Sequence, residues 1–224
     1  MTRAGGSNGM IKIVATLLVI VIFLELLLSV VRKRCQGRLV DLLEEGDYEA
    51  FDEYCGKWAI KAAIPAYTAK VMKLNAAMQK GDHARIKETF QEIEGLKLTS
   101  QEKADISLRG FYYFLPKRDG EMCKKYAAGV RENSRDEAMK ETVSRFYDVL
   151  IEKKDGMLDV LLAEMEGQAE LERYTNEYLV SEIYRNRGDG QRAGLYSGLS
   201  KKHKQAYLEA MSSMEFGKKY RPRQ

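Results

Sequence analysis

Apolar positions recur at a helical period along most of the chain, between short polar breaks. Only 3 prolines interrupt the sequence, and the β-branched residues concentrate near the N-terminus. Long uninterrupted helices therefore fit almost everywhere, and a β-sandwich is disfavoured. The pattern predicts an all-α protein.

Short Gly/Asp turn signals recur between these helical stretches. Their aspartates are 35, 37, 36 and 34 residues apart along the chain: Asp47, Asp82, Asp119, Asp155 and Asp189. Each signal follows one amphipathic stretch and precedes another, which is typical of a tight turn between two antiparallel helices. The sequence therefore predicts helical hairpins of about 35 residues, the spacing of a repeat protein.

A second set of breaks divides successive hairpins. Pro65 suits the start of a helix, Thr99 opens a capping box with Glu102, and Asn133 and Ser134 offer a further cap. The first helix of each hairpin, here called the A helix, is expected at 33–45, 65–80, 101–116, 136–153 and 173–187. The second, or B, helix is expected at 48–60, 83–95, 120–132, 157–170 and 190–200, with a closing helix at 203–215. One hairpin cannot bury its apolar stripe alone, so the fold expected is an α-α solenoid of about five stacked hairpins with a capping helix.

The turn Gly46-Asp47-Tyr48 resembles that of the tetratricopeptide repeat family, a helix-turn-helix unit of 34 residues. Further residues match that family's pattern at single positions: Ser181, Tyr184, Phe90 and Ala193. The resemblance covers most of residues 33–200 and implies a protein-binding groove. The pattern is degenerate, because Pro65 lies two residues beyond the family's proline, and Trp58 and Asp159 stand where it has small residues. A generic α-α solenoid is the alternative.

Residues 13–31 form an apolar run in which Glu25 is the only ionisable group. At about 1.5 Å per residue the run spans roughly 28 Å, the hydrocarbon thickness of a bilayer. A cleavable signal peptide is the rival interpretation, but its apolar region is usually 7 to 15 residues long. The run predicts a single-pass transmembrane helix in which Glu25 either contacts another membrane helix or is a tolerated polar residue.

Cationic residues near this run indicate its orientation. Arg3 and Lys12 precede it, whereas more basic residues follow it: Arg32, Lys33, Arg34 and Arg38. By the positive-inside rule, the N-terminus is expected outside and the rest of the chain in the cytoplasm. The expected organisation is a short tail at 1–12, a transmembrane helix at 13–31, a repeat domain at 32–215 and a basic disordered tail at 216–224.

The net charge of +4 over 224 residues is too small for a dedicated nucleic-acid-binding domain. The charge is uneven, because residues 39–183 carry 21 basic and 29 acidic residues, and residues 184–224 carry 10 and 3. The basic C-terminal end either docks on anionic lipid or forms a solvated cap. The odd number of widely spaced cysteines indicates reduced thiols.

Recognisable catalytic constellations are missing from the sequence. His83 lies beside a turn and His203 in a basic stretch, so both are expected at the solvated surface and neither belongs to a Cys/His metal array. The glycines near Gly188 lack the context of a phosphate loop. We therefore expect neither an enzyme nor a bound cofactor or metal.

Aromatic residues cluster in the later A helices, beginning with Phe111-Tyr112-Tyr113-Phe114. Four consecutive side chains point about 100° apart on a helix, so at least one faces a groove or solvent. If the tetratricopeptide register holds, the ninth position of each A helix lines the concave groove. The partner-binding residues predicted from that register and its neighbourhood are Asn75, Tyr112, Asp148, Glu182, Arg185 and Asn186.

Together these features predict a membrane-anchored adaptor that binds a protein or peptide through its groove. The alternative is a structural subunit of a membrane complex that uses Glu25 and its helix as an interface. An enzyme with an unfamiliar site is a third hypothesis, which would require substrate turnover by the purified domain.

Overall fold

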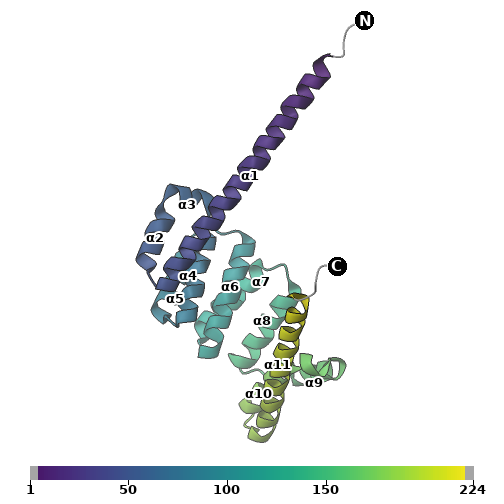
Figure 1. Ribbon diagram of the computed structural model, residues 1–224. Helices are drawn as coiled ribbons and strands as arrows, with labels where there is room; N and C mark the ends of the chain where they lie inside the picture. The colour runs from purple at the N-terminus through teal and green to yellow at the C-terminus, as the bar shows by residue number, and fades with distance from the viewer. Residues whose placement is uncertain (1–4, 220–224) are drawn as a thin grey trace. The chain divides into compact units, whose positions relative to one another are not determined.

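The computed structural model describes the backbone of residues 5–219 (Figure 1). Its side chains are described from residue 29 to residue 212, and before that at positions 18, 22, 23, 25 and 26. Within these bounds the regular structure is entirely helical, as the sequence predicts. The chain divides into two compact units, Met1–Leu98 and Thr99–Gln224.

Unit 1 consists of five helices, α1 (Gly5–Glu45), α2 (Tyr48–Gly56), α3 (Trp58–Ala63), α4 (Ala66–Lys80) and α5 (His83–Glu94). Unit 2 consists of α6 (Ser100–Phe114), the 3-10 helix η1 (Leu115–Lys117), α7 (Gly120–Asn133), α8 (Glu137–Leu150), α9 (Leu158–Gly167), the 3-10 helix η2 (Glu170–Glu172), α10 (Tyr174–Asn186) and α11 (Gly190–Lys219). These bounds agree with most of the predicted helices to within a few residues.

Four of the five predicted Gly/Asp turns share one backbone geometry. The residue before the aspartate is left-handed, with φ of 80° at Gly46, 68° at Gly81, 54° at Arg118 and 78° at Gly188. The aspartate N–H then donates to the carbonyl five residues back, as from Asp47 to Leu42 at 2.9 Å. The aspartate carboxylate accepts from the N–H three residues ahead, as from Ala50 at 2.9 Å. One aspartate therefore ends one helix and caps the next.

The fifth turn differs from the other four. Lys153 adopts the left-handed conformation there, with φ of 56°, and Asp155 follows two residues later. The Asp155 carboxylate accepts from Arg187 Nε at 2.9 Å, and α9 begins only after Met157. Because Asp155 is not the capping residue, this corner is longer than the others.

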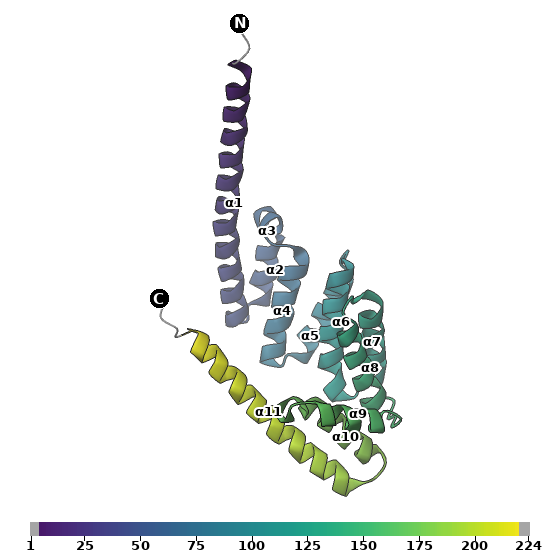
Figure 2. The same cartoon turned by 90° about the vertical axis from the view of Figure 1, so that its right-hand side faces the viewer.

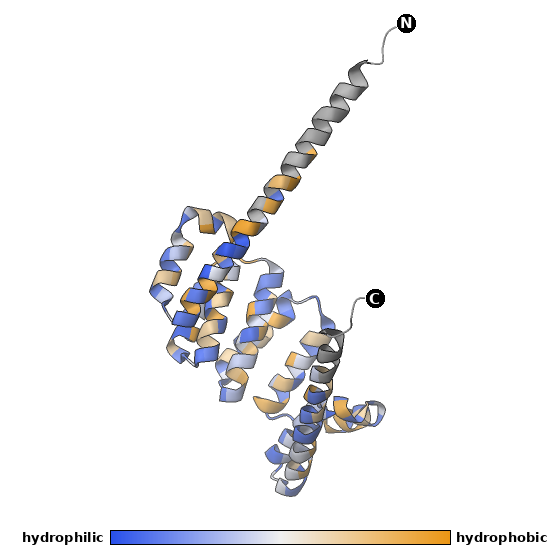
Figure 3. Cartoon of the chain, in the orientation of Figure 1, coloured by the Kyte–Doolittle hydropathy of each residue, from blue (hydrophilic) through white to orange (hydrophobic). Residues whose placement is uncertain are grey.

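The core of unit 1 forms where the last third of α1 packs against α2, α3 and α4 (Figures 1 and 2). Cys35, Leu39, Leu42 and Leu43 recur on one face of α1 and are buried against Phe51 and neighbouring residues. Most of the exposed positions of α1 from residue 32 to its end are hydrophilic, as Figure 3 shows. Burial of this amphipathic stripe holds the first hairpin together.

In unit 2, small residues allow α6 and α7 to approach closely. A Cβ atom added to Gly110 would lie 2.6 Å from the Tyr126 ring, and one added to Gly129 would lie 2.3 Å from Ser107 Oγ. Tyr126 stacks on Phe114 with ring centroids 5.7 Å apart. These contacts fix the crossing of the hairpin.

Three predicted helices have different bounds. The B helix expected at 48–60 is divided, because Lys57 is extended, with ψ of 134°, between α2 and α3. The helices expected at 190–200 and 203–215 are instead the single helix α11, since no proline or helix stop separates them. Helix α11 reaches Lys219, so the tail expected from residue 216 starts within it, and residues 220–224 lie outside the described part.

The prediction of a single-pass membrane protein with its N-terminus outside is wrong for the part of the chain that the structure describes. None of their helices contains a stretch sufficiently long and apolar to span a bilayer. The described side chains of the 13–31 run include Glu25 among exposed apolar residues, and the cationic series begins at Arg32. The remaining side chains of that run, and those of the tail at 1–12, lie outside the described residues.

Candidate functional site

Within each unit a groove lies between two A helices. In unit 1 it separates α1 from α4 and has a volume of about 460 Å³. Its lining combines apolar and amide side chains: Val40, Leu43, Glu44, Met72, Asn75, Ala76, Gln79 and Lys80. We call it the α1/α4 groove. Thus the structure places the predicted residue Asn75 on an exposed part of an A helix, beside a flexible methionine.

Lys80 closes one end of the α1/α4 groove. Its Nζ donates to the carbonyl oxygens of Leu43 at 2.7 Å and of Glu44 at 3.3 Å. These carbonyls belong to the last turn of α1, where no intrahelical donor reaches them. Lys80 therefore stabilises the first corner, and the apolar residues Val40 and Met72 line the rest of the groove together with Gln79.

In unit 2 a smaller hollow of about 160 Å³ lies between α8 and α10. Its lining combines charged, polar and apolar side chains: Ala138, Glu141, Thr142, Arg145, Phe146, Thr175, Asn176 and Leu179. We call it the α8/α10 hollow. It lies between consecutive A helices that pack against each other, as the α1/α4 groove does.

Arg145 is the central charge of the α8/α10 hollow. Its two terminal nitrogens donate to the two oxygens of Glu164 at 2.6 and 2.7 Å, and it also pairs with Glu141. The hydrogen bonds of Arg145 hold the pKa of Glu164 below its usual range, against the effect of burial. One guanidinium thus lies between two carboxylates, and Glu141, with 62% of its side chain exposed, is the outer charge. These ion pairs hold the side chains of the hollow in place, and the two carboxylates around one guanidinium give it a slightly negative charge.

An aromatic ladder crosses the three A helices of unit 2. Tyr112 of α6 packs edge-to-face on Phe146 of α8 with ring centroids 6.3 Å apart, and Phe146 lies 6.2 Å from Tyr178 of α10. Tyr112 is 44% exposed, and Phe146 and Tyr178 are half-buried. Phe146 also lines the α8/α10 hollow, so the ladder and the hollow form one surface.

Phe146 and Tyr178 are not among the partner-binding residues predicted from the sequence. Their signal in the sequence is their spacing, because Tyr112, Phe146 and Tyr178 are 34 and 32 residues apart. An aromatic residue that recurs at the repeat length marks the same helical face each time.

Three predicted partner-binding residues lie together elsewhere in unit 2. Glu182 is only 5% exposed and pairs with Arg118 Nη2 at 2.6 Å and with Arg185. Asn186 donates to the Val149 carbonyl at 3.0 Å, near the end of α8. Glu182 is therefore buried in ion pairs within the chain, and the contacts of this group stabilise helix ends.

The remaining predicted residue, Asp148, lies at the corner between α8 and α9. Its carboxylate accepts from Lys154 Nζ at 2.7 Å, and its own carbonyl accepts from the Lys154 N–H at 2.9 Å. The pKa of Lys154 is raised by this hydrogen bond and by the Asp148 charge. The structure therefore brings Tyr112 to the aromatic ladder but places Asp148 at the C-terminal end of α8, where it pairs with Lys154.

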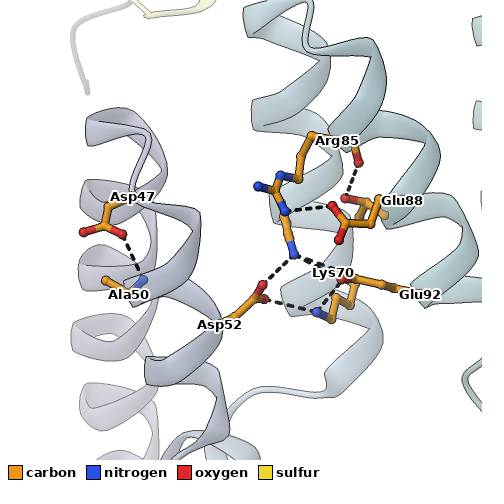
Figure 4. A network of polar contacts seen from close by, with 9 residues as sticks. Asp47, Ala50, Asp52, Lys70, Arg85, Glu88 and Glu92 are labelled. Atoms are coloured by element: carbon orange, nitrogen blue, oxygen red, sulfur yellow. Dashed lines mark hydrogen bonds and ion pairs between the residues drawn. The ribbon is translucent and has the colours of Figure 1, made fainter.

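Unit 1 contains a polar network beneath its surface (Figure 4). Lys73 of α4 is fully buried and donates to Asp52 of α2 at 2.6 Å and to Glu92 of α5 at 3.2 Å. Lys70 bridges the same carboxylates at 3.1 and 2.9 Å. Burial works to raise the pKa of Asp52, but the hydrogen bonds and charges of the two lysines outweigh it and the pKa is lowered. Two cations and two anions thus connect three helices.

His203 is not at the solvated surface where the sequence analysis placed it. It is 5% exposed, its Nδ1 lies 2.9 Å from Glu177 and its Nε2 lies 3.1 Å from Glu170. Nearby, Ser200 donates to the Tyr174 carbonyl at 2.7 Å. His203 was placed at the surface because its neighbours are basic, but the helix α11 runs through residues 200–204 and turns His203 inward while Lys201, Lys202 and Lys204 stay exposed.

The three cysteines are unpaired thiols. Burial, reinforced by Asp119, raises the pKa of Cys123 to about 11. Burial likewise raises the pKa of Cys55. Such thiols are largely protonated at neutral pH and weakly nucleophilic.

Comparison of the chain with protein-family models, curated proteins and solved structures found no match.

Proposed function

We propose that this chain is a tetratricopeptide-like helical repeat protein that binds an extended segment of a protein partner on its A-helix face. The observation that carries the proposal is the aromatic ladder beside the α8/α10 hollow. Tyrosine and phenylalanine offer large contact areas at low entropic cost and are common interface anchors. A hollow next to exposed rings gives a place for an apolar side chain of the bound segment.

The repeated corners support this proposal. Helical hairpins held at regular intervals present their A helices side by side, which creates an extended binding surface without any catalytic group. The α1/α4 groove offers the same kind of surface in unit 1, where the side-chain amide of Gln79 can bond to a peptide backbone.

The charges of the α8/α10 hollow suggest what the segment contains. The exposed Glu141 carboxylate is the outermost charge there, and the Arg145 guanidinium is already occupied by Glu164. We therefore expect an apolar or aromatic anchor residue flanked by a lysine or an arginine. A basic residue in that position gains an ion pair at the rim, and an acidic one is repelled.

Affinity capture with quantitative mass spectrometry tests the proposal. The bait is the full chain, compared with Tyr112→Ala on the ladder and with Leu195→Ala, a control that removes a more exposed apolar residue from α11. At least one partner should be depleted by about tenfold or more with Tyr112→Ala and retained with Leu195→Ala, as for an interface hot spot. Retention of every partner by Tyr112→Ala would contradict the proposal.

A further inference from the structure

The α3 side of unit 1 presents an exposed knob beside an apolar hollow. Trp58, the only tryptophan of the chain, is 82% exposed at the start of α3. A hollow of about 410 Å³ lies between α2, α3 and α4, and its apolar lining comes from Cys55, Ile60, Ile64, Ala66 and Ala69. We call it the α3 hollow. It is separate from the A-helix grooves of the proposed function.

The knob and the α3 hollow are neighbours on one surface. Lys61 lines the hollow, and Trp58 lies three residues before it, on the same side of α3. An indole exposed to this extent leaves a large apolar area in water, which is unfavourable unless a partner covers it. A hollow of 410 Å³ is within the range that holds small organic ligands, roughly 300 to 1,000 Å³, so an indole fits in it.

We propose that this surface is a self-association interface in which Trp58 of each copy occupies the α3 hollow of the other. A knob and a hollow side by side on one chain become mutually complementary when a twofold axis passes between them. Each copy then contributes one tryptophan and one hollow, so both apolar surfaces are covered at once.

The chemistry of the α3 hollow fits an indole in particular. A buried indole N–H requires an acceptor, and the Asp52 carboxylate lines the hollow with 39% of its side chain exposed. The Lys70 and Lys73 ammonium groups keep that carboxylate ionised and fixed in place. Asp52 is therefore the acceptor that we assign to the Trp58 Nε1–H of the second copy.

Charge on the rim also suits a second copy of the chain. Lys57 and Glu53 lie 4.0 Å apart near the knob, and both are well exposed. Asp52, Lys61 and Lys70 line the hollow, and Lys70 is paired with Asp52 and with Glu92. A surface that carries both signs side by side can form opposite-charge pairs with a second copy of itself under a twofold axis.

The interface is small, so the association should be weak. Two exchanged tryptophans bury less than the roughly 1,200 Å² of total surface typical of stable complexes. We expect a dissociation constant on the order of 100 µM, in the range of transient contacts.

Because Trp58 is the only tryptophan, fluorescence of the full chain excited at a wavelength that tyrosine does not absorb reports the environment of Trp58. The emission maximum should shift to shorter wavelength as the concentration rises, in parallel with the mass measured by sedimentation. Trp58→Ser should raise the dissociation constant by roughly 30-fold or more, as truncation of an interface hot spot does. An emission maximum that is the same at all concentrations, or self-association unchanged in Trp58→Ser, would overturn the proposal.

A second variant tests the hollow without removing the indole. Ala66→Glu places a charge in the α3 hollow at an exposed first-turn position of α4, where a carboxylate suits the helix. Alone it should abolish both the shift and the mass increase. Mixed with Trp58→Ser, which supplies an intact hollow, its indole emission should shift again, because one knob then meets one hollow. If Ala66→Glu associates like the wild-type chain, or if the mixture shows no shift, Trp58 does not occupy this hollow.

Discussion

Lys73 is a buried charge whose removal should lower the stability of unit 1. The substitution Lys73→Met tests whether its ion pairs are the reason. The substitution keeps the length and apolar stem of the side chain and removes only its charge. Asp52 and Glu92 then share Lys70 alone, so three charges remain with a net value of −1. The network shown in Figure 4 then carries an uncompensated negative charge next to its buried centre.

The structure sets the magnitude of this effect. Removal of one partner from a buried ion pair typically costs about 3 to 5 kcal/mol of stability. Here the Asp52 and Glu92 side chains are 39% and 28% exposed and keep Lys70, so solvent and the remaining cation reduce the cost. We expect Lys73→Met to lower the free energy of unfolding by about 2 to 3 kcal/mol.

Urea unfolding followed by far-ultraviolet circular dichroism measures this loss. Lys140→Met is the matched control, because Lys140 forms only a surface pair with Glu137, whose side chain is 82% exposed. That control should change stability by less than about 0.5 kcal/mol. A Lys73→Met chain as stable as the control, or more stable than the wild type, would refute the assignment of net stabilisation to the network.

The same network predicts the direction of a pH effect. The pKa of Asp52 is lower in the folded chain than its unfolded value of about 3.9. The stabilisation that ionised Asp52 gives to the folded chain is therefore fully present above the unfolded pKa, and it is lost as the pH falls through the lower folded pKa. In Lys73→Met the acid unfolding midpoint should move to higher pH, and an unchanged midpoint would show that Lys73 does not hold this carboxyl ionised.

Three further substitutions test the packing and the corners, each by urea unfolding. Asp82→Ala removes the cap that accepts from the Arg85 N–H at 3.0 Å and should cost about 1 kcal/mol, whereas Glu94→Ala, at the far end of the same helix, removes no N-terminal cap and should cost less. Gly110→Ala should cost at least about 2 kcal/mol because its Cβ would lie 2.6 Å from the Tyr126 ring, and Gly110→Ala with Tyr126→Leu should recover part of that loss. His203→Leu leaves the buried Glu177 without its 2.9 Å partner and should cost about 2 to 4 kcal/mol, less when Glu177→Gln is added. Equal stabilities within any of these three pairs of variants would contradict the contact concerned.

The helical hairpins could be predicted from the sequence because their signals are local. A glycine before an aspartate fixes both a left-handed helix end and the next N-cap, and both act within five residues. Arg118 shows the limit of this rule, since it adopts the same conformation without being a glycine. The break at Lys57 has no such signal, because neither proline nor a Gly/Asp pair marks it.

The candidate site was harder to predict because it depends on which face each helix presents. Glu182 and Tyr112 were assigned to one groove from a shared register, but Glu182 is buried against Arg118, which is 64 residues away in sequence. His203 turns inward only because α11 continues past residue 200 and packs on α10. These pairings are long-range, so no local pattern in the sequence encodes them.

The central claim is that partners bind the A-helix face, and site-specific photo-crosslinking tests it most directly. A photoreactive amino acid is placed at Tyr112 or Asn75 on A helices, and at Glu132 or Lys87, which are exposed on B helices of the same two units. The proposal predicts adducts with one shared protein from Tyr112, from Asn75 or from both, and none with that protein from Glu132 or Lys87. Adducts that form only from the B-helix positions, or equally from all four, would contradict it.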